Sequence, residues 1–290
     1  MDNVITIRYY NTEQPDLNVA LVRDLVPSLQ NFQRALDKLA IYAENGRILK
    51  SSKLSYRKQG LTDLYISAFE NGSFKVPLLG NVAPGLRASL RGFLQGPYER
   101  AAQEFDEELD LPIRQRMRNI IARDEEGGID YQYEAELAEG SPDFNRRDAQ
   151  GKFLRDMDKS IFAMTKEEGQ GVEIKLYDQE HTSTYDFDRR TARRFHSLVD
   201  RPSIEEPILC HGTIHSLGRK SLRGTYRFHA KYVSNATGEE RNIYILDEVG
   251  MMNLRPYNLG AEFSFIACPV ARYGAHDTMR GDLIFVRLVT

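Results

Sequence analysis

Residues 222–233 carry the clearest pattern in the chain, an alternation of side chains with a period of two. In a strand, successive side chains point to opposite faces of the sheet. One face would carry Tyr226, Phe228, Ala230 and Tyr232, and the other Arg223, Thr225, Arg227, His229 and Lys231. We therefore predict a strand with an aromatic face toward a core and a cationic face toward solvent or a partner.

The last third of the chain predicts a small barrel. Strands are expected at 207–217, 222–233, 241–246, 261–268 and 282–289, with a short helical segment at 247–256. This β-β-β-α-β-β order is typical of the oligonucleotide/oligosaccharide-binding (OB) barrel, and other small barrels share it. We expect an OB-like barrel of five or six strands over residues 206–290.

The first half predicts an α+β arrangement. A strand at 4–10 precedes an apolar stripe of helical spacing that runs from Leu25 to Leu39. Asn71-Gly72 then separates strands expected at 61–70 and 73–78, which is a strong hairpin signal. Helices are expected at 84–94, 97–109, 112–123 and 142–166. A kink or a fresh helix start is expected at Pro27, and helix breaks are expected at Gly96-Pro97 and near Gly151.

These elements predict an α+β protein of two domains. The run Glu-Glu-Gly-Gln-Gly at 167–171 is the expected boundary. Residues 1–167 would form an assembly or interaction domain. Residues 171–290 would form a β-rich domain that begins with a hairpin of strands 172–177 and 182–187, followed by a helix at 189–198.

Composition indicates a cytoplasmic protein without a membrane segment. No apolar run approaches the roughly 20 residues that a membrane helix needs. Cys210 and Cys268 lie in apolar, strand-like runs, which suggests buried, reduced thiols. The net charge of −3 is unevenly distributed, because residues 99–139 hold 13 acidic and 5 basic residues, a local net of −8.

The cationic strand face is the first candidate binding site. Basic side chains on the strands of an OB-like barrel would neutralise phosphates of a nucleic acid or nucleotide. The same face could contact an acidic protein surface or simply be solvated, because residues 206–290 hold 10 basic and 8 acidic residues, a net of only +2. The candidate residues are Arg223, Arg227, His229 and Lys231.

A second candidate is the cluster of four arginines, Arg189, Arg190, Arg193 and Arg194. On a helix they form two pairs of i,i+4 neighbours, and like charges at that spacing repel unless an anion lies nearby. The anion could be a phosphate or the acidic block 104–110 of the same chain or of a neighbouring subunit in a homo-oligomer. A plain solvated helix is the simplest interpretation.

No catalytic residue, cofactor or metal site is predicted. His211 and His215 share a strand face but would lie about 13 Å apart, too far to bind one zinc ion without a bend. The carboxylate pairs Asp156/Asp158, Asp186/Asp188 and Asp247/Glu248 are more typical of helix caps and surface charge. No P-loop, zinc-protease or nucleophile-elbow motif is present.

The opening strand, the hairpin around Asn71-Gly72 and the C-terminal barrel together resemble a group of uncharacterised bacterial two-domain proteins. The resemblance implies a role in antiviral (phage) defence or in mobile-element conflict, and no catalytic residues. We therefore expect a non-catalytic binding or assembly protein with a nucleic-acid, nucleotide or protein partner. The alternatives are a metal-dependent nuclease or other phosphoester hydrolase, and a structural subunit of an oligomeric complex.

Overall fold

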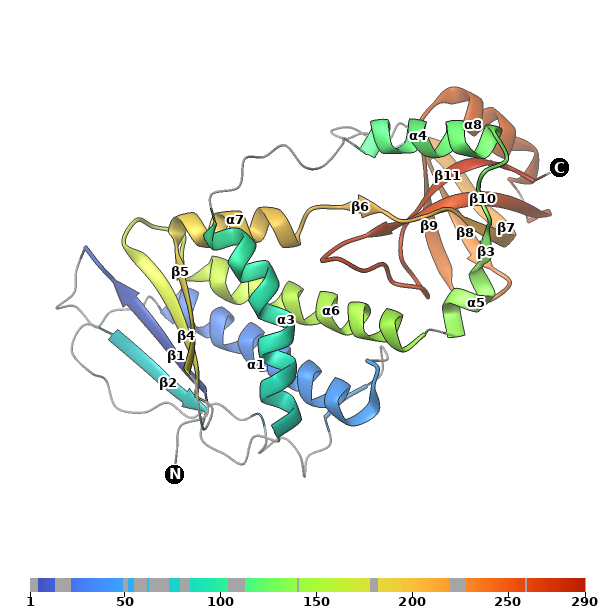
Figure 1. Cartoon of the computed structure of the whole chain (residues 1–290). Coiled ribbons are helices and arrows are strands. Elements are labelled where there is room, and N and C mark those ends of the chain that lie inside the picture. Colours follow the sequence, from blue (N-terminus) through green and yellow to red (C-terminus); the bar gives the residue numbers. More distant parts are fainter. Residues whose placement is uncertain are drawn as a thin grey trace. The chain divides into compact units, whose positions relative to one another are not determined.

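The computed structural model describes residues 5–13, 22–48, 52–54, 62, 73–78, 84–103, 113–139, 141–177, 182–219, 228–258 and 260–289. The fold is α+β, as predicted, and the chain forms two compact units (Figure 1). The first unit comprises Met1–Phe105 and Asn145–Arg201, and the second comprises Asp106–Phe144 and Pro202–Thr290. Each unit is therefore assembled from two separate stretches of chain.

The first unit contains a four-stranded sheet in which every neighbouring pair is antiparallel. Its order is β2 (Ser73–Leu78), β1 (Ile5–Asn11), β4 (Gln170–Tyr177) and β5 (Thr182–Asp188). Helices α1 (Val22–Asn45), α3 (Pro84–Ala102), α6 (Pro142–Ala163) and α7 (Arg189–Val199) lie on one side of this sheet (Figure 1).

Alternation along the strands explains which face of this sheet the helices cover. Ile5, Ile7 and Tyr9 of β1 are buried, whereas Arg8 and Tyr10 between and after them are only half-buried. Strand β4 repeats the pattern with buried Val172, Ile174 and Leu176. The buried side chains meet the apolar stripe of α1, so one face forms the core and the other stays polar.

The hairpin β4–β5 was expected in the C-terminal half but belongs to the first sheet. Strand β4 pairs with β1 along its whole length, from Ile5 opposite Leu176 to Asn11 opposite Gln170. The expected boundary at 167–171 is thus the turn into the third strand of this sheet. Period-two alternation identifies a buried face and leaves the pairing partner open, which is why the assignment failed.

Two expected helix breaks do not occur, and no fresh helix starts at Pro27. Helices α1, α3 and α6 run through Pro27, Pro97 and Gly151, respectively. Pro97 cannot donate to the carbonyl oxygen of Phe93, four residues earlier, and the side chain of Gln150 on α6 donates to that oxygen instead, at 3.0 Å. Packing between the two helices therefore offsets the missing backbone hydrogen bond.

The end of α1 at Asn45-Gly46 is as predicted. Gly46 has a φ of +65°, and its N–H donates to the carbonyl oxygen of Tyr42 at 2.8 Å. The hairpin expected around Asn71-Gly72 lies outside the described residues, apart from Thr62 and strand β2.

The second unit contains the predicted small barrel, closed by five strands. These are β7 (Ile208–Arg219), β8 (Phe228–Ser234), β9 (Glu240–Ile245), β10 (Glu262–Ala271) and β11 (Leu283–Leu288). The order is β7-β8-β9-β11-β10, and β10 pairs back with β7 to close the barrel. Only β9 and β11 are parallel among these barrel pairings.

A short helix, α8 (Glu248–Leu254), connects the third and fourth barrel strands, as the OB-like prediction required. It continues into a 3₁₀ turn, Arg255–Tyr257. The barrel interior is filled by side chains that alternate along each strand, among them Phe228, Tyr232, Phe265 and Phe285.

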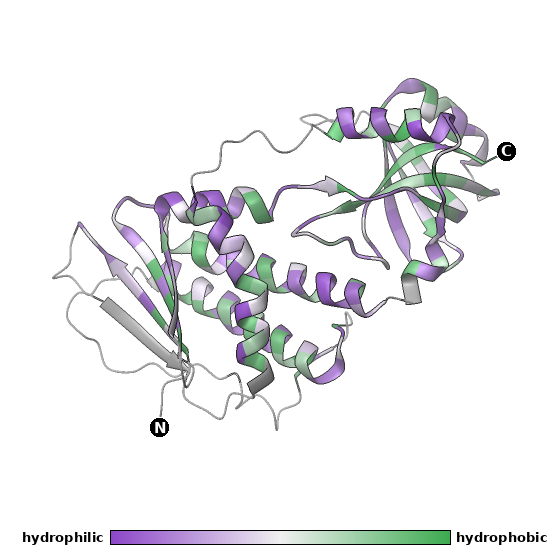
Figure 2. Cartoon of the chain, viewed as in Figure 1, coloured by the Kyte–Doolittle hydropathy of each residue, from purple (hydrophilic) through white to green (hydrophobic). Residues whose placement is uncertain are grey.

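Residues before the barrel strands complete this unit. They form α4 (Ile113–Glu125), β3 (Gln132–Tyr133) and α5 (Glu134–Glu139), and a two-residue strand β6 (Ser203–Ile204) extends β10. Met117 and Ile120 of α4 form a second apolar cluster with Cys268, Val270 and Ile284 on the outer side of β10 and β11. These two strands are therefore apolar on both faces, which Figure 2 shows as mostly hydrophobic ribbons.

An ion pair reinforces the contact between α4 and the barrel. Arg287 of β11 donates to both carboxylate oxygens of Asp124, and the Asp124 side chain is only 3% exposed. Helix α4 thus covers the side of the barrel formed by β10 and β11.

Candidate functional site

The outer face of β7 and β8 is the side of the barrel on which the predicted cationic row lies. Side chains of Phe228, Ala230, Tyr232 and Ser234 are buried, while His229, Lys231 and Val233 between them are half-buried. The predicted alternation is therefore confirmed for residues 228–234. Arg223 and Arg227 lie outside the described residues, and a binding role for the row stays a prediction.

Strand β7 adds polar side chains to the same outer face. His211 and His215 are exposed and Thr213 is half-buried, and Thr213 lies opposite Val233 of β8. The pairing shifts by one residue between Ile214 and Ser216, so a β-bulge bends the strand at His215. The face therefore joins three imidazoles and one ammonium from two adjacent strands.

Acidic residues already contact part of this face. Lys231 Nζ lies 3.0 Å from Glu240 Oε1, and His211 Nε2 lies 3.7 Å from Glu262 Oε2. His211 Nδ1 is also 3.0 Å from Ser264 Oγ. Exposed pairs of this kind contribute about 0–1 kcal/mol, so a phosphate or a partner carboxylate can replace them at little cost.

The segment Cys210 to His215 places its thiol inside the barrel and its two imidazoles on the outer face. The Cys210 side chain is buried in the barrel, and burial raises its pKa well above the usual range of a thiol, so the sulfur stays protonated. Burial likewise raises the pKa of Cys268 to about 12. Across the described residues, no group of three or more His, Cys, Asp or Glu side chains is arranged to hold a metal ion.

Two of the expected carboxylate pairs contain helix caps. Asp188 accepts a hydrogen bond from Thr191 N at 2.7 Å at the start of α7, and Asp247 accepts one from Gly250 N at 2.8 Å at the start of α8. In the third pair, Asp156 binds Lys38 and Asp158 contacts the ring of His196, with 2.9 Å between Asp158 Oδ2 and His196 Nδ1. Asp156, Asp158, Asp188 and Asp247 therefore have structural partners.

The four arginines lie on α7 in the first unit and line a pocket of about 890 Å³. Ala192, Phe195 and Val199 form the buried side of α7, which leaves Arg190 and Arg193 exposed and Arg189 and Arg194 half-buried. The pocket, which we call the arginine pocket, is completed by the ends of β1, β4 and β5: Tyr10, Thr12, Glu168, Gly169, Gln170, Asp186 and Asp188.

Arg189 has one acidic neighbour in the arginine pocket, with 3.7 Å between its Nη1 and Glu168 Oε1. The acidic block 104–110, which was considered as a partner for the arginines, lies outside the described residues. Sequence reasoning found the arginines but missed Tyr10 and the turn at Gly169-Gln170, because the pocket depends on the pairing of β4 with β1.

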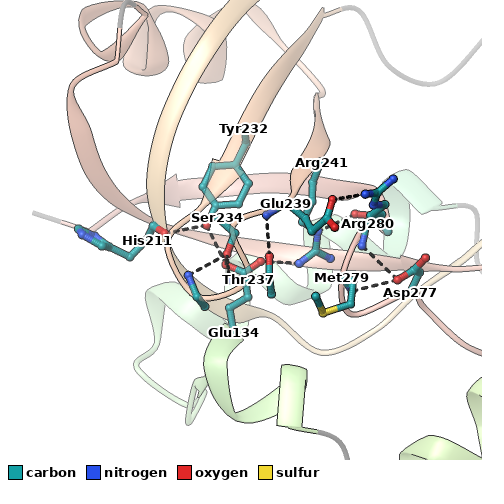
Figure 3. A network of polar contacts seen from close by, with 12 residues as sticks. Glu134, His211, Tyr232, Ser234, Thr237, Glu239, Arg241, Asp277, Met279 and Arg280 are labelled. Carbon is teal, nitrogen blue, oxygen red and sulfur yellow. Dashed lines mark hydrogen bonds and ion pairs between the residues drawn. The ribbon is translucent and has the colours of Figure 1, made fainter. Parts of the chain in front are cut away.

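A buried polar network joins α5 to strands β8 and β9 of the barrel (Figure 3). Glu134, the first residue of α5, lies 2.5 Å from Arg241 Nη1 through its Oε1, and the two side chains are 3% and 1% exposed. Glu134 Oε2 accepts hydrogen bonds from the hydroxyls of Tyr232 at 2.7 Å and Ser234 at 2.8 Å. Arg241 Nε also donates to the carbonyl oxygen of Gly281 at 2.8 Å.

We interpret this network as a structural feature of the barrel. Burial is the main cause that raises the pKa of Tyr232, and the nearby Cys210 and Glu134 raise it further, so its hydroxyl remains a donor. Glu134 was not predicted from the sequence, although Arg241 shares the inward face of β9 with Ile243 and Ile245. A buried arginine in an alternating strand signals a buried acidic partner.

No helix in the described part of the chain is long and apolar enough to cross a membrane. Comparison with protein-family models, with curated proteins and with solved structures found no match, so the candidate sites rest on the geometry of this chain alone.

Proposed function

We propose that this is a non-catalytic binding protein whose OB-like barrel holds single-stranded nucleic acid against the outer face of β7 and β8. The observation that carries the proposal is the division of the barrel surface. Helix α4 covers β10 and β11, whereas the outer side chains of β7 and β8 keep contact with solvent. OB-like barrels commonly use the face of their second and third strands for ligands, and β8 is the second of the five barrel strands.

The chemistry of this face fits a phosphate backbone. His211, His215, His229 and Lys231 supply hydrogen-bond donors that track two adjacent strands, and Arg223 and Arg227 precede β8 in the sequence. The aromatic rings of β8, Phe228 and Tyr232, point into the barrel core. Binding would therefore rest on charge rather than on base stacking and would show little sequence preference.

The test is a fluorescence-anisotropy titration of labelled single-stranded DNA and RNA, with double-stranded DNA alongside, at two salt concentrations. Lys231→Glu and Arg227→Glu should each weaken binding. The slope of log affinity against log salt should fall by about 1 for each lost phosphate contact. Arg118→Glu is the matched control, because Arg118 is exposed on α4, on the covered side of the barrel.

The proposal fails if the wild-type protein does not bind single strands at low salt, or if Arg118→Glu weakens binding as much as Lys231→Glu. In the first case the face would be assigned to an acidic protein partner, and mass photometry of the same sample would report whether that partner is a second copy of the chain. The phage-defence role and the oligomeric state stay predictions.

A further inference from the structure

We propose that the arginine pocket binds a small phosphorylated sugar or nucleotide, with the arginines of α7 on the phosphate and Asp186 on a sugar hydroxyl. The site lies wholly in the first unit and is independent of the barrel face. Its volume of about 890 Å³ falls in the range of about 300–1,000 Å³ that small-molecule sites occupy.

Each acidic residue that lines the pocket already has a partner within the first unit. Of its three carboxylates, Asp188 caps α7, Asp186 accepts from the Tyr10 hydroxyl at 2.6 Å, and Glu168 lies 3.7 Å from Arg189. Four guanidinium groups face these three acids, so the lining carries an excess of one positive charge. Among the described residues, no acid lies within ion-pair distance of Arg193, which is exposed on α7.

The spacing of the arginines favours an anionic ligand. Arg189 and Arg193 are i,i+4 neighbours on α7, and like charges at that spacing repel, so a phosphate bound between them would be stabilising. Guanidinium groups present a planar fork of donors that matches two phosphate oxygens at once. Donors from successive turns of one helix can therefore converge on a single phosphate group.

The opposite wall of the pocket is built by an unusual cross-strand contact. Tyr10 on β1 reaches over Gly171, its partner on β4, to Asp186 on β5, which lies two residues from Asp188, the partner of Gly171 on that strand. A Cβ at Gly171 would overlap the Tyr10 ring, so only glycine lets the ring lie there. Burial is the main cause that raises the pKa of Tyr10, and the hydrogen bond to Asp186 adds to it, which keeps the phenol a donor.

This wall supplies the polar groups that a sugar would need. One oxygen of Asp186 accepts from Tyr10, and its backbone N–H donates to the Tyr98 hydroxyl at 3.2 Å, which fixes the position of the residue. The second carboxylate oxygen of Asp186 can accept from a ligand hydroxyl, as acidic residues do for ribose hydroxyls in nucleotide sites. One wall of the pocket therefore suits the phosphate group of a ligand, and the opposite wall suits a sugar hydroxyl.

The test is isothermal titration calorimetry of the full chain with inorganic phosphate, ribose 5-phosphate and ATP as probes. We expect one site per chain, with ribose 5-phosphate or ATP bound more tightly than inorganic phosphate. Arg193→Gln should weaken all three probes by roughly tenfold or more, the loss expected for a hydrogen bond to a charged group. Arg34→Gln, at an exposed position of α1 outside the pocket, should leave affinity unchanged.

Asp186→Asn separates the two ends of the pocket. It should weaken ribose 5-phosphate and leave inorganic phosphate bound as well as before or better, because a negative charge is removed. Absence of saturable binding of all three probes to the wild-type chain would overturn the proposal. So would equal affinities in the wild-type and Arg193→Gln proteins, which would place the bound anion elsewhere.

Discussion

Replacement of Glu134 by alanine should destabilise the second unit strongly. The change leaves the Arg241 guanidinium, which is 1% exposed, without its acidic partner. It also removes the acceptor for the hydroxyls of Tyr232 and Ser234. Loss of one member of a buried ion pair costs about 3–5 kcal/mol, because the remaining charge stays buried and uncompensated. That loss is a large part of the roughly 5–15 kcal/mol that stabilises a typical domain.

Cysteine labelling measures this loss in the second unit alone. Cys210 and Cys268 are the chain's two cysteines, and both are buried in barrel strands. A brief pulse of an alkylating reagent across a urea series therefore reports the unfolding of the barrel and is silent about the first unit. Comparison of the midpoints and slopes for Glu134→Ala and wild type gives the change in free energy of unfolding.

The matched control is Glu136→Ala, two positions along α5. The Glu136 side chain is exposed and accepts one hydrogen bond, from Tyr133 N at 3.3 Å, so the expected change is about 0.5 kcal/mol or less. A double-mutant cycle with Glu134→Leu and Arg241→Met should show that the double variant loses less stability than the sum of the single variants. A free energy of unfolding for Glu134→Ala that differs from the wild-type value by less than about 1 kcal/mol would refute the reasoning.

Two further predictions concern the same barrel. Gly212→Ala should lower the free energy of unfolding by about 1–3 kcal/mol in the urea assay, because the added Cβ would overlap the carbonyl oxygen of Val233. Gly218→Ala on the same strand is the control and should leave stability unchanged, since its Cβ has only one neighbour, at 4.0 Å. In the native protein, labelling of Cys210 and Cys268 should stay slow between pH 7 and pH 9, because burial raises both pKa values, that of Cys268 to about 12. Rapid native labelling that accelerates tenfold per pH unit would contradict this.

The barrel was predictable because its signals are local. Alternation along each strand and the helical segment after the third strand gave the order of elements, and residues 228–234 bury the side chains that the alternation indicated. The helix caps at Asp188 and Asp247 are also short-range features. Signals of this kind need no knowledge of the partner element.

The failures arose where distant residues decide the outcome. Pro97 was expected to end a helix, but Gln150 supplies the hydrogen bond that the proline cannot make. Strand β4 was assigned to the barrel half, but its partner is β1. Glu134 looks no different from Glu136 in the sequence, and only the approach of Arg241 distinguishes them. The walls of the arginine pocket depend on the same long-range pairing.

The interleaving of the two units has a consequence for synthesis and for dissection of the protein. Residues 106–144 leave the ribosome before the barrel strands that they must join, and Glu134 precedes Arg241 by 107 positions. Until those strands arrive, Met117 and Ile120 of α4 have no apolar surface from the barrel to pack against. A barrel fragment that begins near residue 206 would lack both α4 and Glu134. Neither unit can therefore be excised by a single cut, and the second unit cannot be completed until its last barrel strand has been synthesised.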